Sequence, residues 1–259
     1  MKSVITISVI IPCYNSEKTI GVCIKSILSQ SESVNEIIIV DDGSTDQSLK
    51  IIKESFKYSN VNFKLHEQKN SGPSIARNKG VELASSTHIA FMDSDDQWFL
   101  DHILISKQFL ENNLEYKIAA TKYSSAFVSF SGEITFKKLL LKNYFSTPCV
   151  VLDKDCFFEN GGFNEKMKYS EDYNLWLNIA FKSRVYLLDY VGAQNVDYKR
   201  PFGDTGLSSN LFAMHKGVLQ CYESLCLKGR INFKIYFVLK CVEKLKYFRR
   251  KILTVIYKK

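Results

Sequence analysis

The chain contains 259 residues, of which 46% are apolar and 24% charged, so a folded core is expected and disorder is not. Its length suits one α/β domain, alone or with an appendage. The net charge of +8 is uneven, because residues 228–259 hold eleven Lys or Arg against one Glu, a net of +10, which leaves −2 for the other 227 residues. A nucleic-acid-binding domain would spread basic residues over its folded surface, so we expect no nucleic-acid partner.

Cysteines and apolar runs predict the compartment. The seven cysteines are odd in number, form no C-x-x-C pair and lie mostly within apolar segments, which favours a reducing environment over disulfides or a zinc site. The apolar run at residues 4–11 is too short and too polar for a secretory signal, and no run reaches the roughly eighteen residues of a membrane span. We therefore expect a cytoplasmic protein.

Two nearly continuous β-branched runs, residues 4–11 and 36–40, predict strands inside a parallel sheet, with a helical pattern between them. The first run ends in Pro12-Cys13-Tyr14-Asn15 and the second in Asp41-Asp42-Gly43-Ser44-Thr45-Asp46. Polar loops thus follow both strands at their carboxyl ends, the edge where open α/β sheets bind their ligands.

The residues of these loops point to a nucleotide. Neither G-x-G-x-x-G nor G-x-x-x-x-G-K-[ST] occurs, so metal and side chains would have to hold the phosphates in place of a glycine-rich loop. Asp42 can accept the imide N–H of a pyrimidine, and Tyr14 can stack on its ring. Asp41 and Asp46 are better explained as caps of the helix expected at residues 47–56.

A third strand, residues 61–65, is followed by a Gly72-Pro73 turn and a helix that Ser74 is expected to cap. Arg77 falls in the first turns of this helix, where its cation and the helix N-terminus can together face an anion. The alternative is a solvated surface charge. Its place at the same sheet edge as the other polar loops favours the anion.

Three carboxylates follow a fourth predicted strand, residues 88–92, in the sequence Asp93-Ser94-Asp95-Asp96. Asp93 and Asp95 point the same way if the strand continues, and a turn would add Asp96. Such oxygen ligands suit Mg²⁺ or Mn²⁺, which bind through one or two carboxylates and substrate phosphates. We therefore predict a divalent cation carrying a nucleotide diphosphate. The alternative is an acidic turn that caps the helix beginning near Trp98.

The second half of the chain contains a candidate general base. A Gly161-Gly162-Phe163 turn precedes Ser170, which can cap a helix and so place Glu171 and Asp172 in its first turn, where the helix dipole favours carboxylates. An acid in that place is also oriented by the helix, as a general base requires. Elsewhere in this half we expect a helix at 101–113 and extended segments at 116–123, 126–130, 147–152 and 185–190.

Four of these motifs, in this order, resemble the family 2 glycosyltransferases with a GT-A fold, over roughly residues 3–200. They are Ser8-Val9-Ile10-Ile11-Pro12-Cys13-Tyr14-Asn15, Val40-Asp41-Asp42-Gly43-Ser44-Thr45-Asp46, Gly72-Pro73-Ser74-Ile75-Ala76-Arg77-Asn78 and Asp93-Ser94-Asp95-Asp96. The resemblance implies an α/β fold, with a Rossmann-like, mostly parallel sheet and flanking helices. We divide the chain into a GT-A catalytic domain at 1–207, with a nucleotide-sugar-binding half at 1–100 and an acceptor half at 101–207, and a basic amphipathic helical region at 208–259.

The resemblance also implies roles for single residues. The nucleotide-sugar donor would be bound by Pro12, Tyr14, Asn15, Asp42, Arg77, Asp93, Ser94 and Asp95. Asp93 and Asp95 match the family's D-x-D, which holds the ribose and the metal, with Asp96 sharing the metal, and Asp42 bonds the uracil. Asp172 takes the role of catalytic base. The acceptor or its diphosphate would be met by Glu171, Trp176, Lys199 and Arg200, the last two in a loop that closes over the donor or is simply solvated.

The tail predicts an amphipathic helix. Its apolar positions follow a 4-3-4-3 spacing that is interrupted at Arg249, with lysines on the opposite face. These positions are Ile231, Ile235, Val238, Val242, Leu245, Ile252 and Ile256. The pattern is typical of a helix that lies in a membrane interface, where each basic residue near anionic lipid contributes roughly 1 kcal/mol. The alternative is a helix packed on the catalytic domain or on another subunit.

These features together predict an inverting, metal-dependent transferase in O-antigen, capsule or other surface-polysaccharide synthesis. It would move a hexose of the glucose or galactose type from a UDP-sugar to a lipid-diphosphate-linked sugar, such as GlcNAc-diphosphoundecaprenol, peripherally at the inner face of the cytoplasmic membrane. One carboxylate base beside a metal suffices for this chemistry, whereas a hydrolase needs two acids flanking the bond. The alternatives are a nucleotidyltransferase, whose glycine- and lysine-rich loop is not found, and a non-catalytic binding or scaffold protein on a GT-A core.

Overall fold

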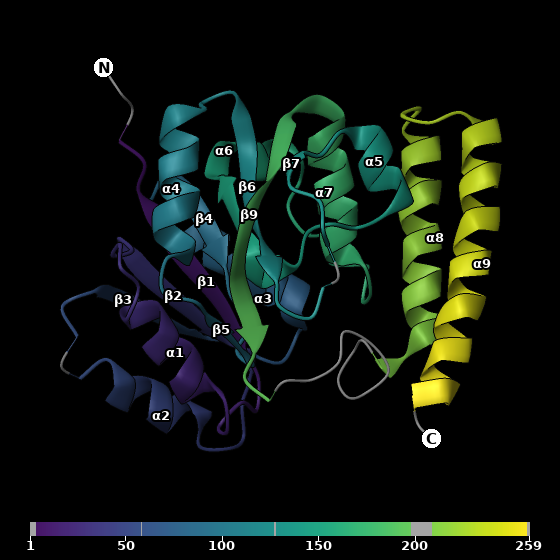
Figure 1. The fold of residues 1–259 in the computed structure, drawn as a ribbon. Helices are drawn as coiled ribbons and strands as arrows, with labels where there is room; N and C mark the ends of the chain where they lie inside the picture. The colour runs from purple at the N-terminus through teal and green to yellow at the C-terminus, as the bar shows by residue number, and fades with distance from the viewer. Residues whose placement is uncertain (1–3, 58, 127, 198–208, 258–259) are drawn as a thin grey trace.

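The computed structural model describes residues 4–57, 59–126, 128–197 and 209–257, with side chains followed to residue 254 (Figure 1). The strands are β1 (Ile7–Cys13), β2 (Glu36–Asp41), β3 (Asn62–Glu67), β4 (His88–Phe91), β5 (Asp96–Trp98), β6 (Tyr116–Tyr123), β7 (Gly132–Glu133), β8 (Val150–Asp153) and β9 (Arg184–Asn195). The helices are α1 (Ile20–Leu28), α2 (Ser48–Ser55), α3 (Pro73–Leu83), α4 (His102–Asn112), α5 (Phe136–Leu141), α6 (Lys154–Glu159), α7 (Glu171–Lys182), α8 (Leu211–Leu227) and α9 (Phe233–Tyr257), with a 3-10 turn at Thr147–Cys149.

The strands join in one mixed sheet with the order β3-β2-β1-β4-β8-β6-β9-β5, and β7 pairs with β9. β3, β2, β1 and β4 run parallel, which the continuous β-branched runs at 4–11 and 36–40 predict for β1 and β2. β8 is antiparallel to both β4 and β6, and β5 is antiparallel to β9. β6 and β9 in the second half are parallel to each other, so the first four strands are all parallel while the rest of the sheet is mixed.

Helices cover both faces of the sheet, and the sheet separates two hydrophobic cores (Figure 1). Side chains alternate along a strand, so Val9 and Ile11 of β1 join a core with α1 and α4, while Ile10 between them joins the other, with α3 and α7. On α1 the residues Ile20, Cys23, Ile24 and Ile27 are buried, so the predicted helix packs one apolar face on the sheet. This packing fixes the carboxyl ends of β1, β2 and β4 at one edge.

Element boundaries differ from the sequence patterns in three places. The helix with Arg77 begins at Pro73 behind Gly72, whose φ of 94° suits glycine, so Ser74 is not its cap. No strand forms at residues 128–130, and residue 127 lies outside the described part. Ser170 occupies the N-cap position of α7 but adopts a left-handed conformation, φ 59°, without a capping hydrogen bond from its side chain.

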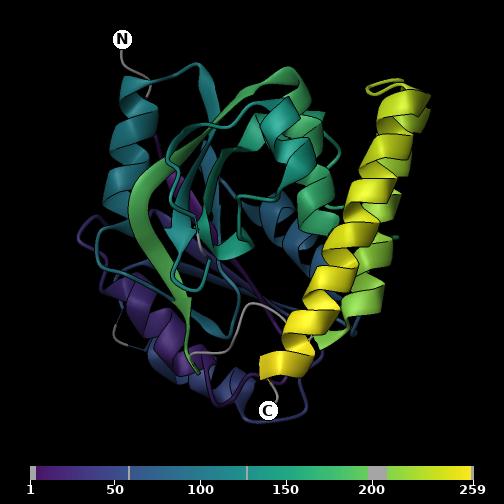
Figure 2. The ribbon, with the colours of Figure 1, turned by 45° about the vertical axis from the view of Figure 1, so that its right-hand side comes forward.

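The C-terminal helices α8 and α9 lie side by side as a hairpin, with α9 on the outside (Figure 2). α8 shares the core of α7 through Cys221, Tyr222 and Leu225, and α9 packs on α8 through Leu239 and Glu243, which are 4% and 2% exposed. No described helix is long and apolar enough to cross a membrane. The domain division at residue 207 stays a prediction, because it falls in 198–208, outside the described residues.

Candidate active site

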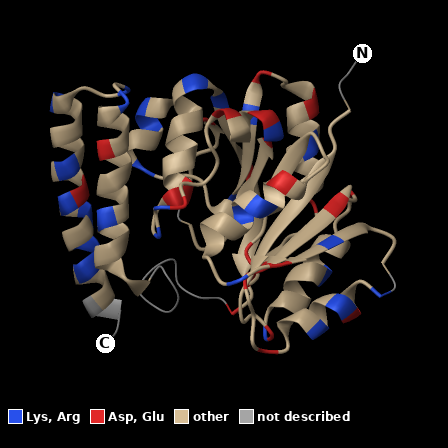
Figure 3. Cartoon of the chain, turned by 180° about the vertical axis from the view of Figure 1, so that it is seen from behind, with Lys and Arg blue, Asp and Glu red and all other residues tan. Residues whose placement is uncertain are grey.

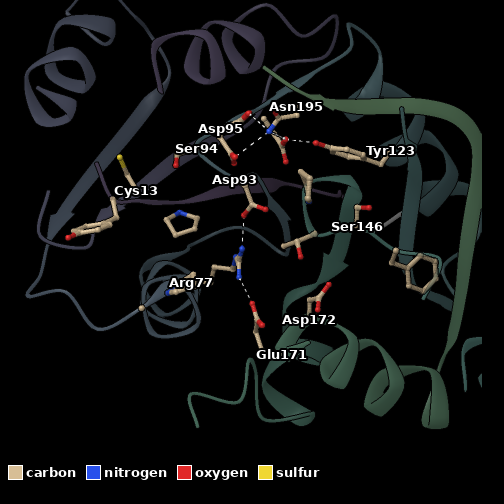
Figure 4. A pocket seen from close by; sticks show the side chains of 18 of the residues that line it. Cys13, Arg77, Asp93, Ser94, Asp95, Tyr123, Ser146, Glu171, Asp172 and Asn195 are labelled. Atoms are coloured by element: carbon tan, nitrogen blue, oxygen red, sulfur yellow. Dashed lines mark hydrogen bonds and ion pairs between the residues drawn. The ribbon is translucent and has the colours of Figure 1, made fainter. Parts of the chain in front are cut away.

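A cavity of about 910 Å³ opens at the carboxyl ends of β1, β2 and β4. Its wall includes, from the predicted site, Pro12, Tyr14, Asp42, Arg77, Asp93, Ser94, Asp95, Asp96, Glu171 and Asp172. The ends of β1, β2 and β4 bring seven of these together, α3 supplies Arg77, and the start of α7 supplies Glu171 and Asp172 (Figure 4). The expected meeting of polar loops at one sheet edge is therefore correct.

The loops after β1 and β2 are tied to each other. Asn15 has a left-handed φ of 47° and its Oδ1 accepts a hydrogen bond from the backbone N–H of Thr45 at 2.8 Å. Tyr14, beside it, is 50% exposed and lines the cavity, so its ring is open to a stacking partner. Asn15 does not line the cavity. Its side chain instead connects the loop after β1 to the loop after β2.

Asp42 is buried, 4% exposed, and anchors the loop that leads into α3. Its Oδ1 accepts from the Gln68 side chain and the Ser71 backbone, both at 2.8 Å, and its Oδ2 accepts from the Gly72 backbone N–H at 2.7 Å. These bonds form the turn that starts the Arg77 helix. Asp42 also lines the cavity, so the carboxylate that anchors this loop forms part of the cavity wall.

Arg77 lies buried between two carboxylates, 6% exposed. One terminal nitrogen is 2.6 Å from Asp93 Oδ1 and the other is 3.1 Å from Glu171 Oε1, which joins the end of β4 to the start of α7 (Figure 4). Burial works against the charge, but Asp93 and Glu171 hold the pKa of Arg77 above its usual range. Arg77 therefore neutralises the acids between the two halves of the cavity.

Glu171 and Asp172 open α7 and diverge. Glu171 points to Arg77, whereas Asp172 turns away from Arg77 into the cavity (Figure 4). Burial raises the pKa of Glu171 in spite of the Arg77 charge beside it. Burial, and next the Glu171 charge, raise the pKa of Asp172 from its ordinary 3.8 to about 7. A carboxyl of this pKa on a cavity wall can accept a proton near neutral pH.

Asn195, near the end of β9, binds two acids of the loop after β4. Its Nδ2 donates to Asp95 Oδ2 at 3.2 Å and to Asp96 Oδ1 at 3.3 Å, and the Tyr123 hydroxyl donates to Asp96 Oδ1 at 2.6 Å. Asp96 is 5% exposed, and burial, followed by the Asp93 charge, raises its pKa to about 8. Beside them, Ser94 is held by the Ser16 hydroxyl at 2.7 Å.

The predicted metal ligands fit a divalent cation in part. No three His, Cys, Asp or Glu side chains are grouped to hold a metal ion anywhere in the described ranges. Asp93 and Asp95 still offer the hard oxygens that Mn²⁺ and Mg²⁺ take as one or two protein ligands, with a diphosphate completing the set. Asp96 does not fit, because its carboxyl is buried and bonded to Tyr123 and Asn195.

Trp176 corrects the sequence prediction for the acceptor site. Its side chain is fully buried, 0% exposed, and packs against Phe91 and Phe163 with ring centres 6.3 and 6.0 Å away, so it supports the cavity from the core. An aromatic residue one helical turn beyond an acid faces the core as readily as a ligand. Lys199 and Arg200, the other predicted contacts, lie outside the described residues.

Sequence reasoning missed several parts of the cavity wall. Tyr123 and Asn195 carry no motif, and only the sheet, by placing β9 between β6 and β5, brings them to the acids. Lys168 and Met214 also line the cavity, Met214 from the first turn of α8. Of these missed residues, Lys168 was the one that the sequence could have indicated, because it lies two residues before Ser170 at the predicted start of the helix with Asp172.

Comparison with known proteins places this architecture in a class. The mannosyltransferase PcManGT of Pyrobaculum calidifontis, in complex with GDP-Man and Mn²⁺, superimposes with a TM-score of 0.73 at 16% identity, covering 94% of this chain and 71% of that one. Residues 1–349 of S. aureus TarS, in complex with UDP-GlcNAc, give 0.70 at 22% identity, covering 85% and 66%. The fold is that of the GT-A glycosyltransferases, with the cavity at the carboxyl edge of its sheet.

Sequence relatives identify the family. The family model described as "Glycosyl transferase family 2" matches residues 8–118. The Escherichia coli UDP-Glc:alpha-D-GlcNAc-diphosphoundecaprenol beta-1,3-glucosyltransferase WfgD is 30% identical over 213 residues, covering 80% of this chain and 81% of that protein. Longer glycosyltransferases of Rickettsia conorii and Rickettsia felis also match, and the chain spans 31% of their length. The chain belongs to glycosyltransferase family 2.

Proposed function

We propose that the protein is an inverting glycosyltransferase that moves a hexose from a UDP-sugar to a lipid-diphosphate-linked sugar in surface-polysaccharide synthesis. The observation that carries this proposal is Asp172, a carboxyl with a pKa of about 7 that shares one cavity with Asp93 and Asp95. WfgD, which covers most of this chain, is named for UDP-Glc and a GlcNAc-diphosphoundecaprenol acceptor. A glucose-type donor and a GlcNAc-type acceptor are therefore the first substrates to test.

In this proposal the donor lies along the edge formed by β1, β2 and β4. Tyr14 stacks on the uracil, Asp42 accepts its imide N–H, and Asp93 bonds the ribose while Arg77 holds Asp93 in position. Mn²⁺ or Mg²⁺, when bound at Asp95 and Asp93 with the diphosphate, supplies positive charge that stabilises the leaving UDP.

Asp172 performs the proton transfer. It accepts the proton of an acceptor hydroxyl, whose oxygen attacks the anomeric carbon on the face opposite UDP. The bond from that carbon to the UDP oxygen breaks, the configuration inverts, and UDP leaves with the electron pair. One base is enough for this transfer, whereas a hydrolase needs two acids that flank the bond.

The test is a panel of UDP-hexoses and other nucleotide sugars with Mn²⁺ and a synthetic GlcNAc-diphosphate lipid, read by mass spectrometry. We expect a product heavier by one hexose with a UDP-hexose, and loss of product when a chelator removes the metal. Transfer that occurs only from a sugar carried by a nucleotide other than UDP would overturn the proposed UDP-hexose donor. Nucleotide binding without any transfer to any acceptor would favour the non-catalytic alternative, and full activity in excess chelator would overturn the metal.

A further inference from the structure

α9 turns an apolar stripe away from the protein. Its buried side is made by Leu239 and Glu243, and it places on the opposite side five exposed residues with 3-4-3-4 spacing. We call these the outer stripe: Val238, Cys241, Leu245, Phe248 and Ile252. Val238, Leu245 and Ile252 are 58%, 71% and 60% exposed. Large apolar side chains at this exposure, in a continuous row, mark a surface that another phase or molecule covers.

The charges around the outer stripe are all positive. Exposed lysine and arginine residues lie around it on α9, namely Lys234, Lys240, Lys244, Arg249 and Lys251. Figure 3 shows that basic residues recur along this helix. The acid within the helix, Glu243, is turned inward, where His215 and Arg250 bind it. The outward face therefore presents cations beside apolar groups without a carboxylate of its own helix.

This charge pattern indicates which kind of partner covers the outer stripe. A second copy of the chain would set the same cations against each other, since flanking positions of a paired helix need opposite charges. An anionic bilayer satisfies both features, because apolar side chains enter the acyl region while lysines meet lipid phosphates. Resting on the proposed function, in which the acceptor is held by a lipid, we propose that the outer stripe of α9 binds the enzyme to an anionic membrane surface.

The stripe also lies at the cavity end of the hairpin. The Tyr247 ring stacks on His215 of α8 with centres 4.8 Å apart, and His215 follows Met214, which lines the cavity. The stripe residues from Leu245 to Ile252 therefore lie at the level of the hairpin where α8 reaches the site, on the face of α9 turned away from α8. A membrane bound there would hold a lipid-linked sugar close to Asp172.

Surface substitutions test this better than deletion, because α9 also packs on α8. We compare wild type with L245Q/I252Q by co-sedimentation with vesicles of equal parts phosphatidylglycerol and phosphatidylcholine, and with vesicles of phosphatidylcholine alone. The matched control is L114Q, since Leu114 is 57% exposed in the turn between α4 and β6. We expect wild type and L114Q to bind the anionic vesicles and L245Q/I252Q to bind at least about tenfold less. Binding should weaken with salt, which screens the cations.

Four outcomes overturn the inference: no binding by wild type, unchanged binding by L245Q/I252Q, an equal loss with L114Q, or self-association of wild type that L245Q/I252Q abolishes. The last result would make a second copy the occupant. Transfer to a water-soluble acceptor analogue separates this inference from the proposed function. If wild type binds vesicles but transfers no sugar, the function is wrong and the surface stands; if it transfers sugar but ignores vesicles, the surface is wrong.

Discussion

Asp172 shows how environment turns an ordinary side chain into a candidate base. A first-turn aspartate is normally ionised, since the helix dipole favours its charge. Here burial and the neighbouring Glu171 outweigh that effect and raise its pKa to about 7. The cost falls on stability: a carboxyl that binds its proton more tightly when folded than when unfolded stabilises the fold below its unfolded pKa, and this contribution is lost as pH rises toward 7.

We expect Asp172→Asn to retain UDP affinity and to lose kcat by about 10²-fold or more, because the variant cannot accept a proton. In wild type, kcat/KM should fall as pH drops below about 7, the pKa at which Asp172 takes up its proton. Above pH 7 the variant should be at least as stable as wild type, since it removes a buried negative charge. Steady-state kinetics across pH, UDP titration and thermal unfolding measure these three quantities. A variant with wild-type kcat would move the base to another residue, with Glu171 next.

Arg77 gives the second prediction at this scale. Arg77→Gln should lower the free energy of unfolding by about 3 kcal/mol, the low end for losing one partner of a buried ion pair, since the Asp93 side chain is 28% exposed. It should also weaken UDP binding, because Asp93 loses the group that positions it. The measurement is urea unfolding together with UDP titration.

Lys79→Gln is the matched control for Arg77→Gln. Lys79 lies on the same helix and pairs with Glu82 at 3.1 Å, with its side chain 37% exposed, so its loss should change stability by less than about 0.5 kcal/mol. Equal effects of the two substitutions would mean that Arg77 does no more than a surface charge.

At the scale of elements, α8 braces the turn that carries the candidate base. Gly217 approaches so closely that a Cβ there would lie 2.5 Å from the Tyr169 carbonyl oxygen and 3.0 Å from Ser170 Oγ. The Cys221 thiol donates to the Ser170 carbonyl at 3.4 Å. Ser170 is the left-handed residue directly before Glu171. The orientation of Asp172 therefore depends on a helix outside the four sequence motifs.

Gly217→Ala should destabilise the protein by about 1 to 3 kcal/mol and lower kcat about tenfold or more, because the added methyl group must push the Tyr169-Ser170 turn aside. UDP affinity should change little, since the donor loops lie on other strands. Gly21→Ala is the control: the new Cβ would lie 3.5 Å from Ile51, an ordinary contact, and the substitution should stabilise helix α1 by about 0.5 to 1 kcal/mol. If Gly217→Ala lowers the free energy of unfolding but leaves kcat of the folded protein unchanged, α8 contributes packing and does not orient the base.

For the whole molecule, the uneven charge and the hairpin belong together. Of the eleven Lys or Arg in residues 228–259, seven lie on α9, a helix that is attached by one face and exposed on the other (Figures 2 and 3). The two interpretations of the tail pattern, a packing helix and an interfacial helix, thus apply to opposite sides of α9. The structure adds that the attached side of α9 buries Leu239 and the ion-paired Glu243, while its exposed side carries the outer stripe.

Removing residues 230–259 should lower the free energy of unfolding by at least about 3 kcal/mol, since it deletes the buried side chains of Ile231 and Leu239, 5% and 4% exposed, at about 1.5 to 3 kcal/mol each. Thermal and urea unfolding of the truncated chain measure the change. Unfolding identical to that of the full chain would show that α9 docks only weakly. In that event, truncation would serve as a second test of membrane binding.

The sequence by itself determined the parallel half of the sheet, the polar loops at its edge and the family. The reason is local: continuous β-branched runs, glycine turns and acids at strand ends specify strands and loops without distant contacts. It also predicted the helix with Asp172, although not the left-handed turn that starts it. Tertiary structure alone decided which acids stay available, because burial and partners depend on residues far away in sequence.

Three acids after β4 read alike in the sequence, yet in the fold they differ. Asp93 pairs with Arg77, Asp95 bonds to Asn195, and Asp96 is buried and bonded to Tyr123, since α3, β9 and β6 bring those partners from other parts of the chain. For the same reason, only the tertiary structure decides that Trp176 packs in the core and that α8 contacts the turn before the candidate base. An amphipathic pattern indicates that a helix has an apolar side, but only packing decides which side is buried. On α9, one face packs on α8 and the outer stripe remains exposed.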